Sequence, residues 1–119
     1  KVALDQQGRY AFSAGSELQG FIWDLKTGKQ ISQLELSRAQ IITAARFSPN
    51  GKWLVTGSPS RALILWDVAT GKKIQQWQVR AILNSRPASA VIHAVAFLND
   101  NQIISESSSG VAEVWEIKQ

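Results

Sequence analysis

Short runs of alternating apolar and polar residues, separated by turn residues, fill the whole chain. Residues 41–78 show the pattern most completely, with β-branched and apolar residues concentrated at 41–47, 52–57, 62–66 and 72–78. Pro, Gly, Asn and Asp separate these runs, and these residue types favour tight turns. No stretch keeps a helical period over the roughly 10–12 residues that a helix needs. The pattern therefore predicts an all-β protein built from short strands.

The same pattern recurs along the chain. Trp23-Asp24 recurs as Trp66-Asp67, which lies 43 residues further on, and Trp115-Glu116 follows after another 49. The 43-residue shift also brings Thr27-Gly28-Lys29 onto Thr70-Gly71-Lys72 without a gap. Four short strands per unit at this period are typical of the blades of a β-propeller.

The repeated unit resembles that of the WD40-repeat family. In the second unit the resemblance is carried by residues 47–52, 55–58 and 63–72. The first unit repeats these motifs at 5–9, 13–16 and 20–24, and the third repeats them more weakly at 97–101 and 111–116. The resemblance implies an all-β fold of WD40-like β-propeller blades, each of them a four-stranded antiparallel sheet.

The strand count predicts an incomplete ring. We expect a first blade at about 1–35, a second at about 41–78 and a third at about 91–119, with a long inter-blade loop at 79–90. The third blade lacks its fourth strand, so the chain holds just under three blades. Three explanations remain open. The chain is a piece of a longer propeller, or a homo-oligomer closes the ring, or it is an open array, which exposed sheet edges disfavour.

The resemblance also implies a buried hydrogen-bond network of His, Ser or Thr, Asp and Trp in each blade. The places of the His are Leu36-Ser37 and Arg86-Pro87, and those of the Asp are Glu17, Ser60 and Ser109. With these residues missing, we expect the network not to form. Apolar packing and backbone hydrogen bonds would then hold each blade together.

Composition and charge narrow the class of partner. Hydrophobic residues make up 45% of the 119 residues, which favours a globular chain over a disordered one. The 13 Lys and Arg against 9 Asp and Glu give a net charge of +4, spread over hairpins and loops on both sides of the blades. This favours a solvated surface over nucleic-acid or membrane binding. We therefore expect another protein, or the remaining blades of the propeller, as the partner. The compartment stays open, with the cytoplasm as the default expectation.

The chain offers little catalytic chemistry. Cysteine is absent and His93 is the single histidine, which excludes disulfides, thiol nucleophiles and metal sites built from several His or Cys. Asp24, Asp67 and Glu116 recur with the repeat, so they fall in different blades and are expected to cap turns rather than form an acid/base pair. We therefore predict no enzyme activity and no cofactor in this segment.

Large aromatic residues also recur with the repeat. Trp23, Trp66 and Trp115 could form a ligand cage, but one buried tryptophan in each unit fits packing between blades better. We assign these three tryptophans, with Asp24 and Asp67, a structural role.

The resemblance implies that partners dock on the face formed by two classes of loop. One class leads from the fourth strand of a blade to the first strand of the next (d–a), and the other joins the second and third strands (b–c). The candidate partner-binding residues on this face are Ile41, Thr43, Val91 and His93 at d–a loop ends, Ser16, Pro59 and Ser108 in b–c turns, and Ile82 and Leu83 in the long loop. The long loop could equally be of no consequence.

These observations predict a protein-interaction scaffold, formed by a propeller segment of a larger protein or assembly. The alternative is a structural or regulatory propeller in a multidomain enzyme whose catalytic domain lies outside this chain.

Overall fold

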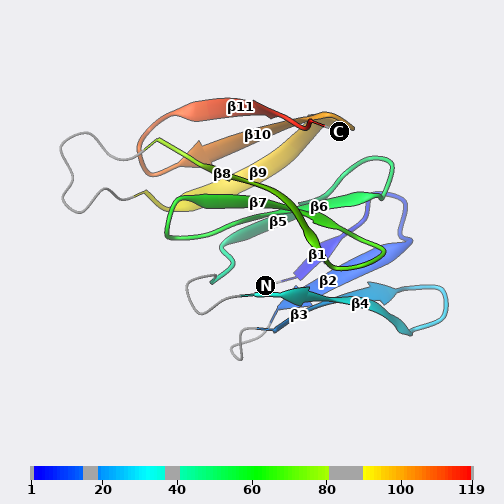
Figure 1. The fold of residues 1–119 in the computed structure, drawn as a ribbon. Helices are drawn as coiled ribbons and strands as arrows, with labels where there is room; N and C mark the ends of the chain where they lie inside the picture. The colour runs from blue at the N-terminus through cyan, green and yellow to red at the C-terminus, as the bar shows by residue number, and fades with distance from the viewer. Residues whose placement is uncertain (1, 15–18, 37–40, 81–89, 119) are drawn as a thin grey trace.

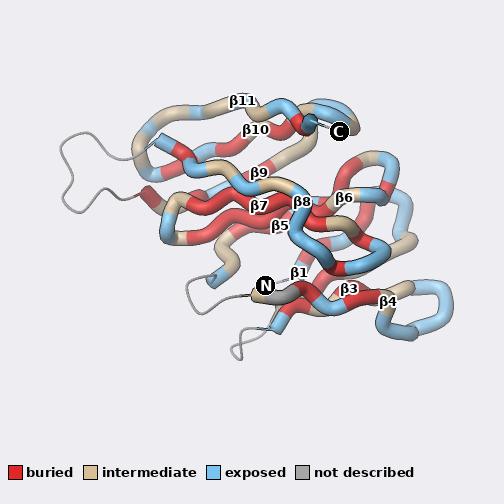
Figure 2. The backbone as a smooth tube through the Cα atoms, in the orientation of Figure 1, coloured by how far each residue is buried: buried red, intermediate tan, exposed pale blue. Residues whose placement is uncertain are grey.

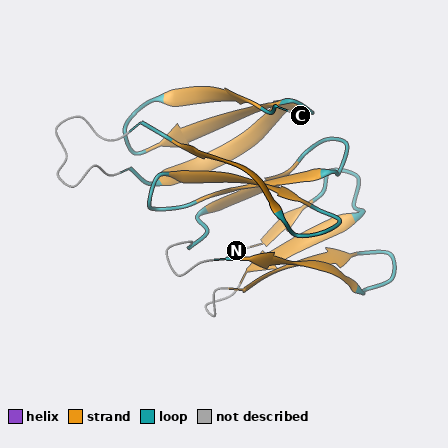
Figure 3. Cartoon of the chain, viewed as in Figure 1, coloured by secondary structure: helices purple, strands orange, loops and turns teal. Residues whose placement is uncertain are grey.

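The structure, a computed structural model, describes residues 2–14, 19–36, 41–80 and 90–118. These residues form strands and loops without a helix, which confirms the predicted all-β class (Figure 3). No described segment is therefore a helix long and apolar enough to cross a membrane. The strands are β1 (Val2–Leu4), β2 (Tyr10–Ala14), β3 (Gln19–Asp24), β4 (Gln30–Glu35), β5 (Ala44–Phe47), β6 (Trp53–Gly57), β7 (Ala62–Asp67), β8 (Lys73–Gln78), β9 (Ile92–Asn99), β10 (Gln102–Ser107) and β11 (Ala112–Glu116).

The strands form three antiparallel sheets in chain order, stacked side by side (Figure 1). The first sheet has the order β1-β2-β3-β4 and the second has the order β5-β6-β7-β8. The third contains β9, β10 and β11, and no described residue pairs with the outer edge of β11. Among the first strands of the sheets, β5 contacts both β1 and β9. The arrangement is an arc of propeller blades, and the sheets do not close into a ring.

The turns after the third strand of the first two sheets have the same geometry. The ladder shifts register between Ile22 and Trp23 in the first sheet and between Leu65 and Trp66 in the second. The turn of the second sheet closes with a hydrogen bond from the Gly71 N–H to the Asp67 carbonyl, at 2.8 Å. Gly71 has a φ of 75°, a left-handed conformation that glycine adopts without strain. The sequence repeat is therefore also a repeat of backbone conformation.

A layer of apolar side chains fills the space between the first and second sheets. Antiparallel neighbours project to the same face of a sheet, so the register decides which side chains meet. The buried members of this layer include Phe12, Ile22 and Leu34 of the first sheet and Leu54, Ile64 and Trp66 of the second. Figure 2 shows this buried material in the middle of the stack, with the outer strands β8 and β11 largely exposed or half-buried.

A second apolar layer lies between the second and third sheets. It includes Val55, Leu63 and Leu65 on one side and Ile92, Val95 and Ile103 on the other. A Cβ atom on Gly57 would meet the side chain of Ile92, so the absence of a side chain at this position lets the two sheets approach. Neighbouring residues on the strands of the second sheet thus serve opposite interfaces, which explains why β7 is buried along most of its length.

We expected the hydrogen-bond network of His, Ser or Thr, Asp and Trp to be absent from each blade. This expectation is wrong for the bond between the tryptophan and the Ser or Thr hydroxyl. In each sheet the indole Nε1–H of the recurring tryptophan donates to a hydroxyl on the neighbouring strand at 2.9 Å. The pairs are Trp23 with Ser13, Trp66 with Thr56, and Trp115 with Ser105. Ser and Thr were present in the sequence, but their placement diagonally across from the tryptophans, two residues beyond each directly paired residue, depends on strand register. The hydrogen bond survives because it needs neither the missing His nor the missing Asp.

The first strand of the second sheet starts later than its sequence predicts. The apolar run begins at residue 41, but β5 begins at Ala44. Just before it, the Thr43 hydroxyl donates to the Ile92 carbonyl of the third sheet, and the Thr43 N–H donates to the Gly57 carbonyl at 2.9 Å. The hydroxyl bond ties the entrance of β5 to the third sheet, and the N–H bond holds the same residue against β6 of its own sheet.

Candidate functional site

Two classes of loop meet at one end of the stack, on the left in Figure 1. In the second sheet the b–c turn at 58–61 lies against the start of the third sheet. Ser60 forms an isolated parallel bridge with Ala90, and the Ile92 N–H donates to the Ser58 carbonyl at 3.1 Å. This junction, here called the loop end, contains most of the partner-binding candidates that the structure describes.

The candidates at the loop end differ in how much they offer to a partner. Ile41 is 62% exposed and His93 is exposed, whereas Pro59 and Val91 are half-buried. Ser108 is tied to Val91 by two hydrogen bonds, because its hydroxyl accepts from the Val91 N–H at 2.8 Å and its own N–H donates to the Val91 carbonyl at 2.9 Å.

The hydroxyl of Thr43 is likewise engaged with Ile92. The polar candidates therefore hold the loop end together, while Ile41 and His93 are presented on its surface. Ser16, Ile82 and Leu83 lie outside the described residues.

Arg61 is a loop-end residue that the sequence reasoning missed. Its φ of 72° is left-handed, a conformation that costs a residue with a side chain roughly 1 kcal/mol or more. Gly110, the residue in the corresponding turn of the third sheet, has a φ of 81°. The Arg61 Nε–H donates to the Val79 carbonyl at 2.9 Å, and the Val79 N–H returns a bond to the Arg61 carbonyl. Arg61 thus anchors the chain where it leaves β8.

A concave pocket of about 510 Å³ lies along the inner strands β1, β5 and β9. We call it the axial pocket. Val2, Leu4, Ala44 and Ala94 supply apolar walls, and Arg46 and His93 supply basic groups. Arg46 was not a candidate from the sequence, although the repeat carries a signal, since the equivalent positions in the other units are alanines.

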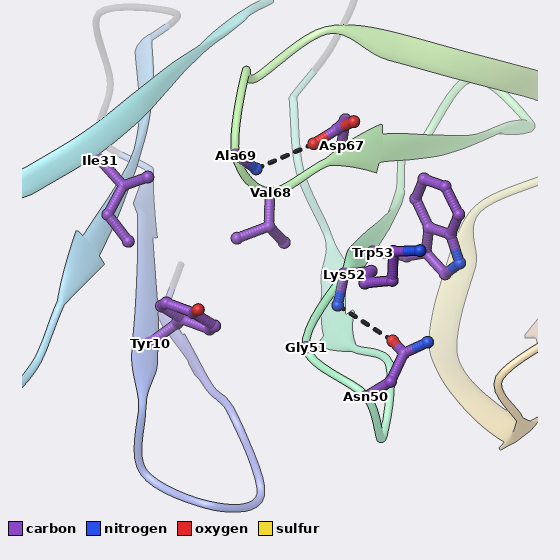
Figure 4. A pocket seen from close by; sticks show the side chains of 9 residues that line it. All are labelled: Tyr10, Ile31, Asn50, Gly51, Lys52, Trp53, Asp67, Val68 and Ala69. Atoms are coloured by element: carbon purple, nitrogen blue, oxygen red, sulfur yellow. Dashed lines mark hydrogen bonds between the residues drawn. The ribbon is translucent and has the colours of Figure 1, made fainter.

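A second pocket, of about 330 Å³, opens at the other end of the stack between the first two sheets. Figure 4 shows Tyr10 and Val68 pointing into it, with Ile31 on one wall. The Trp53 ring turns away from these residues, toward the third sheet. Tight turns border the pocket: the Asp67 carboxylate accepts from the Ala69 N–H at 2.9 Å, and the Asn50 side chain accepts from the Lys52 N–H at 2.9 Å.

We call this opposite end of the stack the turn end. The carboxylates of its turns accept hydrogen bonds from backbone N–H groups. Asp24 accepts from the Lys26 and Thr27 N–H groups at 2.8 and 3.3 Å, so it caps its turn as Asp67 does. The structure does not bring these two carboxylates together as an acid/base pair. Within the described part of the chain, no group of three or more His, Cys, Asp or Glu could hold a metal ion.

One ion pair fixes the first turn. The Arg9 Nε–H donates to the buried Asp5 carboxylate at 2.7 Å, and its Nη2–H reaches the Pro49 carbonyl of the second sheet at 3.2 Å. The hydrogen bond from the Arg9 guanidinium lowers the pKa of Asp5 below its usual value, against the opposing effect of burial. This arrangement links the first two sheets.

The first sheet exposes apolar residues on the face that looks away from the second. Val2 and Leu4 are 68% and 64% exposed, whereas the residues 43 positions later, Ala45 and Phe47, are 9% and 5% exposed. The half-buried Trp23 lies on the same face. Its equivalent, Trp66, is buried between two sheets.

The outer face of the third sheet shows the same contrast. Val114 is 54% exposed, while its equivalents Ile22 and Leu65 are fully buried. Leu98 is also 54% exposed. We call these two surfaces the end faces. Each repeats a surface that is covered elsewhere in the stack.

Comparison with known proteins agrees with the predicted resemblance. Residues 28–67 match the family model of the WD domain, G-beta repeat. The chain is similar to the β-propeller domain of Myceliophteria thermophila Cps50 (Swd1), with a TM-score of 0.76 and 21% identity over 99% of this chain and 35% of that one. It is also similar to the computationally designed Ika4 protein, with a TM-score of 0.71 and 24% identity over 92% of this chain and 61% of that one. The chain thus spans less than two thirds of either structure.

Proposed function

Because the chain carries a WD40 repeat and has the fold of a WD40-type propeller segment, we propose that it is a protein-interaction scaffold. WD40 propellers generally serve in this way. The partner would dock at the loop end, between the second and third sheets. Binding would rely on shape and on exposed side chains carried by a rigid framework, with no covalent step.

The observation that supports this proposal is that the loop end combines hydrogen-bonded backbone with exposed side chains. Hydrogen bonds from Thr43 to Ile92 and between Ser108 and Val91 fix the backbone there. Ile41, an apolar side chain that is 62% exposed, lies two residues before Thr43, and the exposed His93 directly follows Ile92. A rigid site loses little conformational entropy on binding, and an exposed apolar residue gains free energy when a partner covers it. Ile82 and Leu83 of the long loop would extend the contact.

Site-specific photo-crosslinking in the cells of origin tests this proposal. A benzophenone amino acid at Ile41 would sample the loop end, and the same group at Ala69, an exposed residue of the opposite turn end, would be the matched control. We expect a distinct protein to crosslink from position 41 and not from position 69. We also expect Ile41→Asp combined with His93→Ala to abolish binding of that protein. Equal crosslinking from both positions would refute the docking site.

The triple variant Ile82→Ala, Leu83→Ala and His93→Ala tests the contribution of the long loop. We expect it to weaken the same interaction. Unchanged binding of every crosslinked protein would remove the long loop and His93 from the site.

The end faces support a second part of the proposal, which is that further propeller blades cover them. The packing inside the stack is head to tail, so a blade from the same protein or from a second copy could add to either face. Val114→Lys would place a charge on one of these faces. If copies of this chain associate, sedimentation velocity should show the associated species lost in the variant. A wild-type chain that sediments only as a monomer would refute self-association.

A further inference from the structure

We propose that the axial pocket receives the carboxylate side chain of an acidic residue of the partner protein, with Arg46 as its anchor. This inference rests on the proposed scaffold function and adds the chemistry of the partner. His93 belongs both to the loop end and to the wall of the axial pocket, so the two surfaces are continuous. An extended segment docked at the loop end could therefore reach Arg46.

The fold itself does not require an arginine at this position. Arg46 lies in the middle of β5 opposite Val55, and the corresponding residues of the other two units are Ala3 and Ala96. Ala3 lies in β1 and Ala96 in β9, which like β5 are the first strands of their sheets. A cation placed where the repeat otherwise carries alanine is better explained by a ligand than by blade packing.

The guanidinium group of Arg46 is also unused within the described residues. Arg46 is exposed, and no ion pair or side-chain hydrogen bond links its guanidinium to another residue of the described ranges. Arg9 offers a contrast, since it is held by Asp5 and by the Pro49 carbonyl. An arginine without an internal partner retains its full set of N–H donors, which match the two oxygens of a carboxylate.

The walls of the axial pocket specify the rest of the ligand. Val2 and Leu4, whose exposed side chains belong to the outer face of the first sheet, border the pocket on the β1 side, and Ala94 adds exposed apolar surface from β9. No carboxylate lines the pocket among the residues that the structure describes, so nothing there competes for an acidic ligand. Its volume of about 510 Å³ lies within the range of ordinary ligand sites. This composition fits a glutamate or aspartate flanked by apolar residues.

Two short peptides of matched size test the proposal by NMR titration of the isotope-labelled chain. The probe is N-acetyl-leucyl-glutamyl-leucinamide, and the control carries glutamine in place of glutamate. We expect the glutamate peptide to shift the Arg46 Nε–H and His93 resonances saturably. A hydrogen bond between charged groups corresponds to roughly a 10- to 100-fold difference in affinity, so the glutamine peptide should bind at least about 10-fold more weakly. Equal binding of the two peptides, or no binding of the glutamate peptide, would overturn the proposal.

Variants of Arg46 separate the anchor from the fold. Arg46→Ala restores the residue of the other units, so we expect an unchanged unfolding midpoint and at least a 10-fold loss of glutamate-peptide affinity, about the lower limit for a lost charged contact. Arg46→Glu should bind the corresponding lysine peptide in preference to the glutamate peptide. Full binding by a folded Arg46→Ala variant would overturn the role of Arg46.

Two further measurements complete the test. An acetate titration distinguishes a carboxylate of a partner protein from a free carboxylate, and a binding assay with the crosslinked protein distinguishes failure of the acidic anchor from failure of the scaffold function. Free acetate is expected to bind far more weakly than the peptide, because it cannot cover the apolar walls. Equal affinity for acetate would overturn the assignment to a partner protein. The protein crosslinked from Ile41 should bind Arg46→Ala more weakly than wild type. If its affinity is unchanged, the acidic anchor is wrong while the scaffold function stands, whereas loss of the loop-end crosslink itself refutes the scaffold function.

Discussion

Replacing Thr56 by valine removes the hydroxyl that accepts the indole N–H of Trp66 but keeps almost the same side-chain shape. The two atoms are 2.9 Å apart, and the residues are only 3% and 1% exposed. Water cannot reach the indole N–H to replace the lost partner. A buried donor left without an acceptor costs about 1–3 kcal/mol, so we expect Thr56→Val to lower the free energy of unfolding by that amount.

The first sheet provides a matched control for this substitution. Trp23 donates to Ser13 over the same 2.9 Å, but both residues are half-buried rather than buried. After Ser13→Ala, water can hydrogen-bond to the indole N–H of Trp23, so the expected loss is below about 1 kcal/mol. The difference between the two variants thus reports the effect of burial on the same hydrogen bond.

Urea unfolding followed by tryptophan fluorescence and far-UV circular dichroism measures both losses. The slope of free energy against urea should stay constant, so that the midpoint reports stability. In a background carrying Trp66→Phe, Thr56→Val should lose its penalty, because no indole N–H remains to be satisfied. Equal losses for Thr56→Val and Ser13→Ala, or a penalty that persists without the indole, would refute the reasoning.

Two further predictions concern the turns of the first two sheets. The Asp5 carboxylate, whose pKa the bond from Arg9 lowers, should stabilise the fold fully above about pH 4, the ordinary pKa of an aspartate, and lose this effect as the pH falls through the lower folded value. Urea unfolding should therefore show a stability gap between wild type and Asp5→Asn at pH 7 that shrinks near pH 3, and a constant gap would contradict the pKa assignment. A Cβ at Gly71 would meet the Gln33 backbone of the first sheet, whereas one at Gly28, with nearly the same φ, meets nothing within 4 Å. Gly28→Ala should cost about 1 kcal/mol of unfolding free energy through backbone strain alone and Gly71→Ala clearly more, and equal losses would rule out the contact.

Much of the fold was accessible from the sequence because its signals are local. Alternation of apolar and polar residues sets which face of a strand is buried, and turn residues set where strands end. The recurrence of Trp23, Trp66 and Trp115 then placed these strands in three units, and the three sheets of the structure follow the same order. The comparison with alanine at the equivalent positions could also have drawn attention to Arg46.

The functional candidates were accessible only in part. The pattern located Ile41 and His93 at loop ends but could not show that both are exposed while the hydroxyls of Thr43 and Ser108 are engaged. Exposure and hydrogen bonding at a loop depend on which neighbouring sheet it touches. That information is absent from a single repeat.

The sequence by itself determined the all-β class, the repeated blade, the turn positions and the lack of a multi-histidine or cysteine site. Only the tertiary structure decided which hydroxyl meets each tryptophan, which apolar residues are covered, and that Arg46 faces a pocket beside His93. The features that the sequence determined depend on the chemistry of residues that are adjacent in the chain. The features that the tertiary structure decided depend on strand register and on the stacking of sheets, which bring together residues that are far apart in the chain.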